Sequence, residues 1–253
     1  MDAETIRVGI EEGVGTVTIA RPPVNALRFA DIAEINEVFK RLGDDEAVRA
    51  VVLTGEGERA FIAGTDVEEL AALTAETARE STALVQETVN RVYELPVPVI
   101  CAVNGPAVGS GVAFASAADI RIASTKATLC LPEVNVGVLG GSKHLARLAP
   151  QGTTRRMMYT GRHLGAADLY RLGIVESVHE PGELLDTATE LAREIASKLP
   201  IAVRLAKEGL NRTESMALAE GYAYECELTA RLRADPASAE QSRAFLARFG
   251  SRR

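Results

Sequence analysis

The feature of this sequence that most constrains its fold is a pair of short apolar segments, each followed by a glycine-containing loop. Residues 48–53 and 97–103 are rich in valine and isoleucine, and such runs are typical of strands buried on both faces of a sheet. Helical patterns accompany them, with apolar residues three and four positions apart over 31–42 and 75–94. Strands that alternate with helices predict an α/β fold.

The remaining segments extend this pattern. Residues 6–10 and 14–20 predict a β-hairpin, 112–118 a tightly packed helix, and 120–123 and 127–131 two further strands. Asp31 is a candidate N-cap for the helix over 31–42. From about Pro200 onward only helical patterns occur, over 202–210, 216–232 and 238–249. We therefore predict an α/β core over residues 1–199 and a helical C-terminal region over 200–253.

Composition excludes several classes of function. Among 253 residues there are 28 Lys and Arg against 35 Asp and Glu, a net charge of −7, and aromatic residues make up 4% with no Trp. Proteins that bind nucleic acid present basic surfaces and stacking aromatics, so a nucleic-acid-binding function is not favoured. The N-terminus has no apolar signal region and no run reaches the length of a membrane span. We expect a cytoplasmic protein without membrane contact, whose three cysteines are reduced.

Two loops are candidates for chemistry. Residues 61–67 and 104–114 both contain glycine, follow a predicted strand and precede a predicted helix. Such loops leave backbone N–H groups free at helix N-termini, where they bind developing negative charge. The glycines could equally serve only close packing. A dinucleotide fingerprint would need glycine at Phe114, and a serine nucleophile at Ser110 would need glycine at Val108 and Val112.

The two loops belong to an ordered series of segments that resembles the crotonase, or enoyl-CoA hydratase/isomerase, superfamily. This resemblance implies a spiral of ββα units, a helical C-terminal part that forms a homotrimer or a dimer of trimers, and an acyl-CoA thioester as substrate. Coenzyme A then enters as part of the substrate, with no permanently bound cofactor and no metal. The matching segments are 21–27, 61–66, 104–111, 118–123, 131–137 and 160–161.

The resemblance also assigns roles within the loops. In this family one amide from each loop binds the thioester oxygen, and by motif these amides belong to Thr65 and Ser110. Two preorganised donors stabilise the charge that forms when the thioester becomes an enolate. Their loop neighbours Ala63, Gly64 and Gly109 are expected to contact the CoA thioester. Asp66 is a further candidate contact, although it also suits the cap of the following helix.

The sequence departs from the hydratases of this family at one position. These hydratases use two glutamates, of which the second is present as Glu133, while Ala113 stands at the first. One carboxylate is enough to move a proton from one carbon to another, so we expect an enoyl-CoA double-bond isomerase with Glu133 as general acid and base. Dienoyl-CoA isomerases carry a second carboxylate where this chain has Gly141. Lys143 or His144 could assist Glu133.

Two other functions remain open at this stage. One is an enoyl-CoA hydratase, with Asp66, Glu68 or Glu69 substituting for the missing glutamate. The other is a subunit that binds acyl-CoA without turnover. The acyl chain itself is not defined by the sequence, because the shape of a pocket depends on side chains from distant segments.

The CoA phosphates need cationic partners. The family places a basic residue of the last helix near them, often from a neighbouring subunit, and Phe245 with Arg248 resembles that pattern. Arg28 is a second candidate, because it follows the matched segment 21–27 closely. A solvated C-terminal tail is an equally good interpretation of Arg248.

Overall fold

A six-stranded sheet organises the chain. The computed structural model describes residues 4–250, apart from the side chains of residues 248–250. The strands run in the order β1-β2-β3-β4-β6-β9, with β1 and β2 antiparallel and the others parallel. Their bounds are β1 (Ile6–Glu11), β2 (Val14–Ile19), β3 (Ala50–Gly55), β4 (Val99–Val103), β6 (Ile120–Ser124) and β9 (Ser177–His179). A smaller sheet holds β5 (Ala107–Val108), β7 (Thr128–Cys130) and β8 (Leu164–Gly165).

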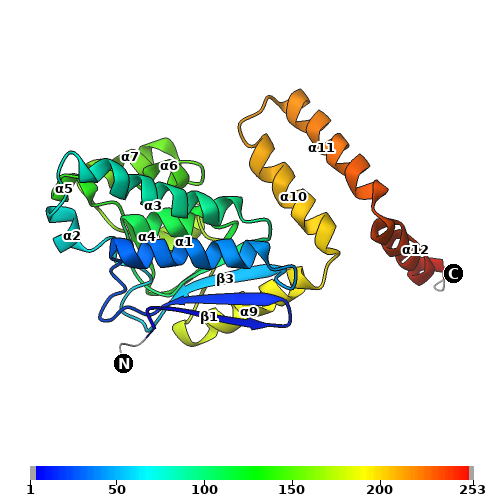
Figure 1. Ribbon diagram of the computed structural model, residues 1–253, viewed down its shortest axis with the longest axis horizontal. Helices are drawn as coiled ribbons and strands as arrows, with labels where there is room; N and C mark the ends of the chain where they lie inside the picture. Colours follow the sequence, from blue (N-terminus) through cyan, green and yellow to red (C-terminus); the bar gives the residue numbers. More distant parts are fainter. Residues whose placement is uncertain (1–3, 251–253) are drawn as a thin grey trace.

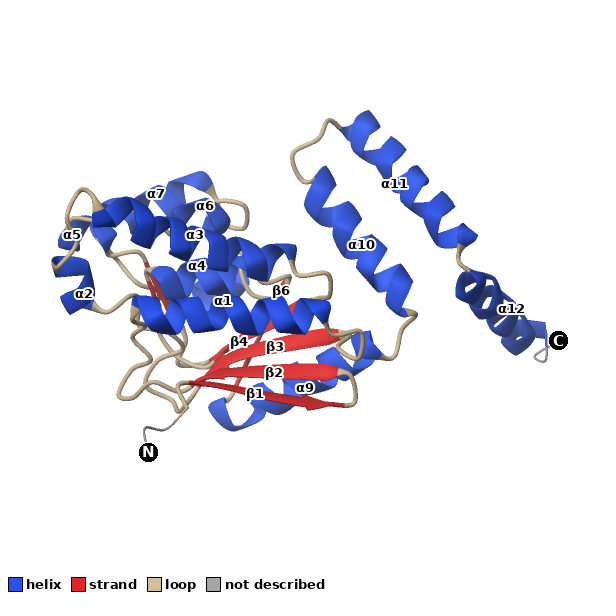
Figure 2. Cartoon of the chain, in the orientation of Figure 1, coloured by secondary structure: helices blue, strands red, loops and turns tan. Residues whose placement is uncertain are grey.

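Helices cover both faces of the main sheet. Figure 2 shows α1 on one face, with α3 and α4 beyond it, and α9 on the other face. The helices of the core are α1 (Phe29–Asp44), α2 (Val67–Ala71), α3 (Thr77–Glu94), α4 (Ser110–Ala117), α5 (Glu133–Val136), α6 (Ser142–Leu145), α7 (Gln151–Thr160), α8 (Ala166–Arg171) and α9 (Pro181–Ala196). The predicted α/β class is therefore confirmed.

The alternation of side chains along β3 explains why it is buried throughout. All six residues of β3 are buried. Val51 and Leu53 join the apolar cluster under α1 and α3, whereas Ala50 and Val52 join the cluster under α9. Successive side chains of a strand point to opposite faces, so a strand between two helical layers is buried on both faces. The polar member, Thr54, satisfies its hydroxyl by donating to the Ala102 carbonyl at 3.0 Å.

The starts of two helices test the predicted capping residues, and one of them differs from the prediction. Asp31 is not the N-cap of α1. Arg28 is the N-cap, and Asp31 lies three residues into the helix, where its carboxylate accepts the Arg28 backbone N–H at 2.7 Å. The prediction failed because the side chain reaches back to the cap residue from inside the first turn. Asp66 caps α2 as expected, with Oδ1 accepting the Glu68 N–H at 2.9 Å.

After β9 and α9, the described chain consists of helices alone. These are α10 (Pro200–Thr213), α11 (Leu218–Ala234) and α12 (Pro236–Gly250), and they extend away from the core (Figure 1). Lys207 on α10 fastens this region, because its buried ammonium donates to the Val97 carbonyl at 3.0 Å and to Asp119 at 2.7 Å. Within the described range, no helix is long and apolar enough to cross a bilayer.

Candidate active site

The first glycine loop is held along one edge by the segment before α1. Leu27 donates its N–H to Gly64 at 2.8 Å, and Asp66 donates to Leu27 at 2.7 Å. These two bonds flank Thr65 in a parallel bridge, so the Thr65 N–H points to the other side. Among the described residues no acceptor receives that N–H. The loop therefore presents a free backbone donor.

Asn25 fixes this loop from beneath. It is buried with φ of +56°, and its Nδ2 lies 3.1, 2.9 and 3.2 Å from the carbonyl oxygens of Glu56, Ala60 and Phe61. Its own carbonyl accepts the Ala63 N–H at 3.3 Å. Asparagine suits this position because it tolerates a positive φ and because its side-chain amide can hydrogen-bond to several backbone groups at once.

The second glycine loop leads into α4. Gly109 precedes α4 with φ of +53° and donates its N–H to the Cys130 carbonyl at 3.0 Å. Ser110 is the first residue of α4, and the first N–H groups of a helix have no partner within it. A Cβ at Gly111 would lie 2.2 Å from the Ile62 oxygen, so only glycine allows the two loops to meet. The hydroxyls of Thr65 and Ser110 lie 3.3 Å apart, which brings the two predicted oxyanion residues together.

Glu133 lies beside the second loop at the start of α5. Its residue surface is 6% exposed, and its Oε2 has no hydrogen-bond partner among the described residues. Burial raises the pKa of this carboxyl above its ordinary value. A hydrogen bond from its own backbone N–H lowers the pKa to a smaller extent. Side chains at Gly109 and Gly141 would come within 3.3 and 3.4 Å of Oε1. The absence of side chains there keeps space around the carboxylate.

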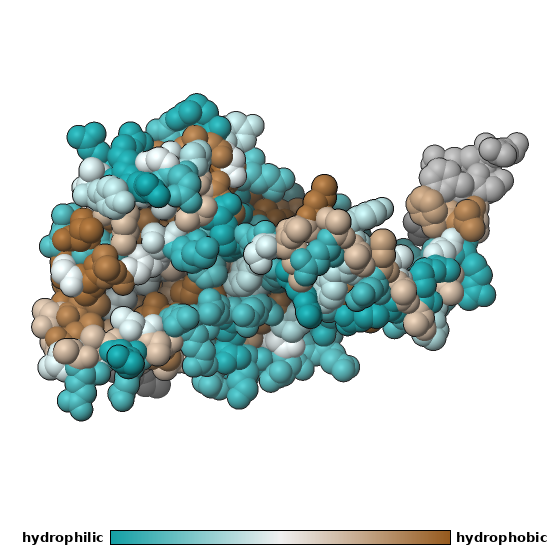
Figure 3. All heavy atoms as spheres, turned by 90° about the horizontal axis from the view of Figure 1, so that it is seen from above, coloured by the Kyte–Doolittle hydropathy of each residue, from teal (hydrophilic) through white to brown (hydrophobic). Residues whose placement is uncertain are grey.

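These groups open into a cavity of about 470 Å³. Its walls carry the predicted residues Ala63, Gly64, Thr65, Gly109, Ser110 and Glu133, together with Ala113. Apolar side chains supply much of the rest, including Phe29, Leu70, Leu73, Val85, Val89, Val136, Val138 and Leu139. Hydrophobic side chains also gather at the end of the molecule where α2 and α5 lie (Figure 3), and Val67, Val136 and Leu139 are exposed there. Among the described lining residues, Glu133 is the sole carboxylate.

Other predicted contacts do not lie in this wall. Arg28 forms an ion pair with Asp31 at 3.2 Å and does not line the cavity, and neither does Asp66. Phe245 is 59% exposed on α12, and α12 lies at the opposite end of the molecule from α2 and α5 (Figure 1). Arg248 lies among the residues whose side chains are not described. A role of these residues at the CoA phosphates stays a prediction.

Sequence reasoning missed a polar network behind the cavity. Asn90 on α3 and His144 on α6 both line the wall, and His144 Nε2 lies 3.3 Å from Asn90 Oδ1. Arg147 Nη1 lies 3.1 Å from the other ring nitrogen of His144. Burial lowers the pKa of His144, and Arg147 and Lys143 lower it further while Glu214 opposes them. The signal in the sequence was the helical spacing of Asn90 with Gln86 and Thr82.

Among the residues that the structure describes, there is no cluster of three or more His, Cys, Asp or Glu suited to a metal ion. The chemistry offered by the cavity is thus two backbone N–H donors, one buried carboxylate and an apolar space beside them. Donors placed where negative charge develops, next to a base of raised pKa, suit proton abstraction next to a carbonyl.

Comparison with known proteins agrees with this geometry. A short-chain-enoyl-CoA hydratase from Clostridium acetobutylicum is 37% identical over 231 residues, covering 90% of this chain and 88% of that protein. A crotonyl-CoA hydratase from Syntrophomonas wolfei is 37% identical over 215 residues, 83% of each chain. The crystal structure of an enoyl-CoA hydratase from Bacillus anthracis matches with a TM-score of 0.92 at 33% identity, covering 97% of both chains.

The fold expected from the resemblance is confirmed by this structural match, including the helical C-terminal region. The family model described as enoyl-CoA hydratase/isomerase matches residues 9–249, almost the whole chain. Since the glycine loops and Glu133 fall inside that match, this chain belongs to the enoyl-CoA hydratase/isomerase family, the crotonase superfamily.

Proposed function

We propose that this acyl-CoA enzyme moves the double bond of an enoyl-CoA from the 3- to the 2-position, using Glu133 as its one proton carrier. The observation that carries the proposal is the composition of the cavity wall. Glu133 is its sole carboxylate among the described residues, and Ala113, at the position of the first hydratase glutamate, lines the same wall without a polar group.

The reaction begins with the thioester oxygen at the N–H groups of Thr65 and Ser110. Glu133 removes a proton from C2, and the electrons of that C–H bond pass into a dienolate whose negative charge lies on the thioester oxygen. When the dienolate collapses, the C2=C3 bond of the product forms. The negative charge on the thioester oxygen is stabilised by the two N–H donors; one such donor is worth about 10²–10³ in rate. Glu133 then returns the proton to C4, and the C3=C4 bond is lost.

The environment of Glu133 suits both halves of this shuttle. Burial without a partner for Oε2 disfavours its charged form and raises its pKa. A carboxylate of raised pKa is a stronger base toward C2 and, once protonated, holds its proton until C4 receives it. A shuttle that keeps its proton away from water is what a one-carboxylate isomerase requires.

The three acidic residues considered as substitutes are engaged elsewhere or lie outside the wall. Asp66 caps α2, and Glu69 Oε2 accepts the Phe29 N–H at 2.6 Å. Neither they nor Glu68 line the cavity. This arrangement supports a single carboxylate over a pair.

Hydration of a 2-enoyl-CoA is the second candidate, and the names of the relatives favour it. Both relatives at 37% identity are named as hydratases. In this chain hydration would require Glu133 alone to activate water and to supply the proton to C2. Because a general acid or base is worth about 10²–10⁴ in rate, losing one of two would leave hydration slow.

A panel of matched 2-enoyl-, 3-enoyl- and 3-hydroxyacyl-CoA substrates, analysed by mass spectrometry and NMR, tests the proposal. We expect fast conversion of 3-enoyl-CoA to 2-enoyl-CoA with little 3-hydroxyacyl-CoA. A 3-enoyl-CoA deuterated at C2 should retain part of its deuterium at C4 in ordinary water, because one buried carboxylate carries it. Faster hydration than isomerisation would establish the hydratase. Binding of acyl-CoA by calorimetry with no product from any substrate would establish a non-catalytic subunit.

A further inference from the structure

The wall that α3 presents to the cavity is polar along one line. The lining residues of α3 are Thr82, Val85, Gln86, Val89 and Asn90, which are three and four residues apart and therefore share a face. Val85 and Val89 form an apolar row, while Thr82, Gln86 and Asn90 form a parallel row with hydrogen-bonding groups. Thr82 and Gln86 are exposed, and the Thr82 hydroxyl donates to the Ala78 carbonyl at 2.6 Å, so Asn90 is the half-buried member of this row.

Asn90 has a defined orientation within this row. The Arg147 guanidinium can only donate, so the His144 Nδ1 at 3.1 Å accepts its hydrogen bond. The neutral ring then carries its proton on Nε2, which donates to Asn90 Oδ1 at 3.3 Å. The Asn90 Nδ2 therefore points its two hydrogens elsewhere, and among the described residues no protein acceptor receives them.

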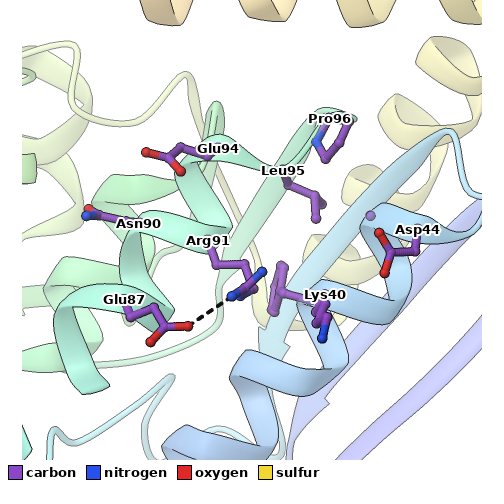
Figure 4. Close-up of a pocket in the computed structure, with 10 residues that line it drawn as sticks. Lys40, Asp44, Glu87, Asn90, Arg91, Glu94, Leu95 and Pro96 are labelled. Carbon is purple, nitrogen blue, oxygen red and sulfur yellow. Dashed lines mark hydrogen bonds and ion pairs between the residues drawn. The ribbon is translucent and has the colours of Figure 1, made fainter. Parts of the chain in front are cut away.

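The other side of α3 is not the destination of this amide. A groove between α1 and α3 is lined by Lys40, Asp44, Glu87 and Arg91, and Asn90 lines it as well as the cavity. Figure 4 shows Arg91 directed toward Glu87, whereas the Asn90 side chain points away from Arg91 and Lys40. The Arg91 and Glu87 charges satisfy each other at 2.9 Å. The free donor of Asn90 thus belongs to the cavity rather than to this groove.

His144 is itself held from behind. Arg147 lies over the Tyr93 ring at 4.4 Å and pairs with Glu214 at 2.6 Å. The Tyr93 hydroxyl also donates to Glu214, at 2.8 Å. Arg147 and Tyr93 contact the imidazole directly, and Glu214 holds both of them. Because the imidazole is fixed before any ligand arrives, Asn90 loses little conformational freedom when it forms a hydrogen bond.

We propose that Asn90, oriented by His144, donates a hydrogen bond to an oxygen atom on the acyl group, so that the preferred substrates are acyl-CoA thioesters with a hydroxyl, oxo or carboxylate substituent. This proposal rests on the binding of acyl-CoA in the proposed function. Lys143 is exposed and lines the same cavity, so it adds a cation near the wall that Asn90 forms. Asn90 would be a specificity residue, and His144 a positioning residue that acts through it.

The test compares acyl-CoA pairs that are equal in length and differ in one oxygen substituent. We expect the wild type to favour the oxygenated member in kcat/KM, and Asn90→Leu to lower that preference about tenfold or more. His144→Leu should lower the preference in the same direction. His144→Gln should retain the preference for the oxygenated member, because the glutamine amide nitrogen can donate to Asn90 in place of the imidazole Nε2. Separate experiments with hydroxyl-, oxo- and carboxylate-substituted acyl-CoA identify which oxygen group accepts the hydrogen bond of Asn90.

Equilibrium binding separates this proposal from the isomerase reaction. The Kd values of saturated acyl-CoA pairs report the same preference when no turnover occurs, so a chain that binds oxygenated chains better but isomerises nothing would refute only the proposed function. An unchanged preference in Asn90→Leu, or a wild type that favours plain chains in all arms, would overturn the role of Asn90. Failure to bind any acyl-CoA would overturn both.

Discussion

Replacing Glu133 with glutamine separates the chemistry of this carboxylate from its effect on folding. The amide has nearly the same shape but cannot accept the C2 proton. Since no other carboxylate of the described chain lines the cavity, no neighbour can take over, and the full contribution of one general base is lost, about 10²–10⁴ in kcat. In the wild type, the acid limb of kcat/KM should lie above the range of an ordinary glutamate, because burial raises its pKa and only the carboxylate abstracts a proton.

The same substitution should stabilise the fold. The raised pKa means that the folded chain binds this proton more tightly than the unfolded chain does. The free energy of unfolding therefore falls as pH rises from the pKa of Glu133 in the unfolded chain to its pKa in the folded chain. Above the folded-state pKa, this loss of stability remains constant. A buried acceptor without a partner costs about 1–3 kcal/mol, and more when charged. We expect Glu133→Gln to gain about 1 kcal/mol at neutral pH, about 2–4 °C in Tm for a chain of this size.

Two assays check this prediction. Conversion of 3-enoyl-CoA measures the chemistry, and thermal unfolding at several pH values measures stability. The matched control is Glu37→Gln, at an exposed position of α1, which should change neither. The reasoning is refuted if Glu133→Gln retains wild-type turnover, or if its stability gain does not grow between about pH 4 and neutrality.

Three further substitutions test other parts of the structure. Gly64→Ala adds a Cβ 3.1 Å from the Val108 oxygen at a residue with φ of +93°, so we expect about 1–2 kcal/mol of strain. Because the next amide, that of Thr65, would be displaced, kcat/KM should fall about tenfold or more. Lys207→Met leaves Asp119 without its ion pair and should lower the free energy of unfolding in urea by about 3 kcal/mol. Ala113→Glu places a second carboxylate in the cavity wall, and product analysis should show faster hydration of 2-enoyl-CoA than in the wild type.

The sequence predicted the elements whose signals are local. Residues 48–53 and 97–103 became β3 and β4 because β-branched residues fill both faces of a buried strand. Helix α9 was not predicted, although it covers one face of the sheet. Its buried residues Leu184, Ala188 and Ala192 are spaced four apart, but alanine is common on any helical face and does not by itself indicate a core contact.

The candidate site divides in the same way. Thr65, Ser110 and Glu133 were selected because their short motifs resemble those of a known family, and all three line the same cavity. The contact between Asn90 and His144 joins residues 54 positions apart, and nothing in either segment reveals the other. The ion pair of Arg28 with Asp31 was likewise not visible in the sequence, because it depends on how α1 begins.

The glycines of the site connect the loop that holds Ser110 to the buried Glu133 carboxylate. Gly109 gives Ser110 its place at the start of α4 through a positive φ, and a side chain at Gly109 would also meet Glu133 Oε1 at 3.3 Å. Gly141 approaches both groups, with the Gly109 oxygen 3.1 Å and Glu133 Oε1 3.4 Å from where its Cβ would stand. A side chain at either glycine would therefore crowd the carboxylate, and one at Gly141 would also crowd the backbone of the second glycine loop. In the proposed reaction the Ser110 N–H and the Glu133 carboxylate both act on one thioester, so the proposal requires glycine at these positions for the chemistry as well as for the turn.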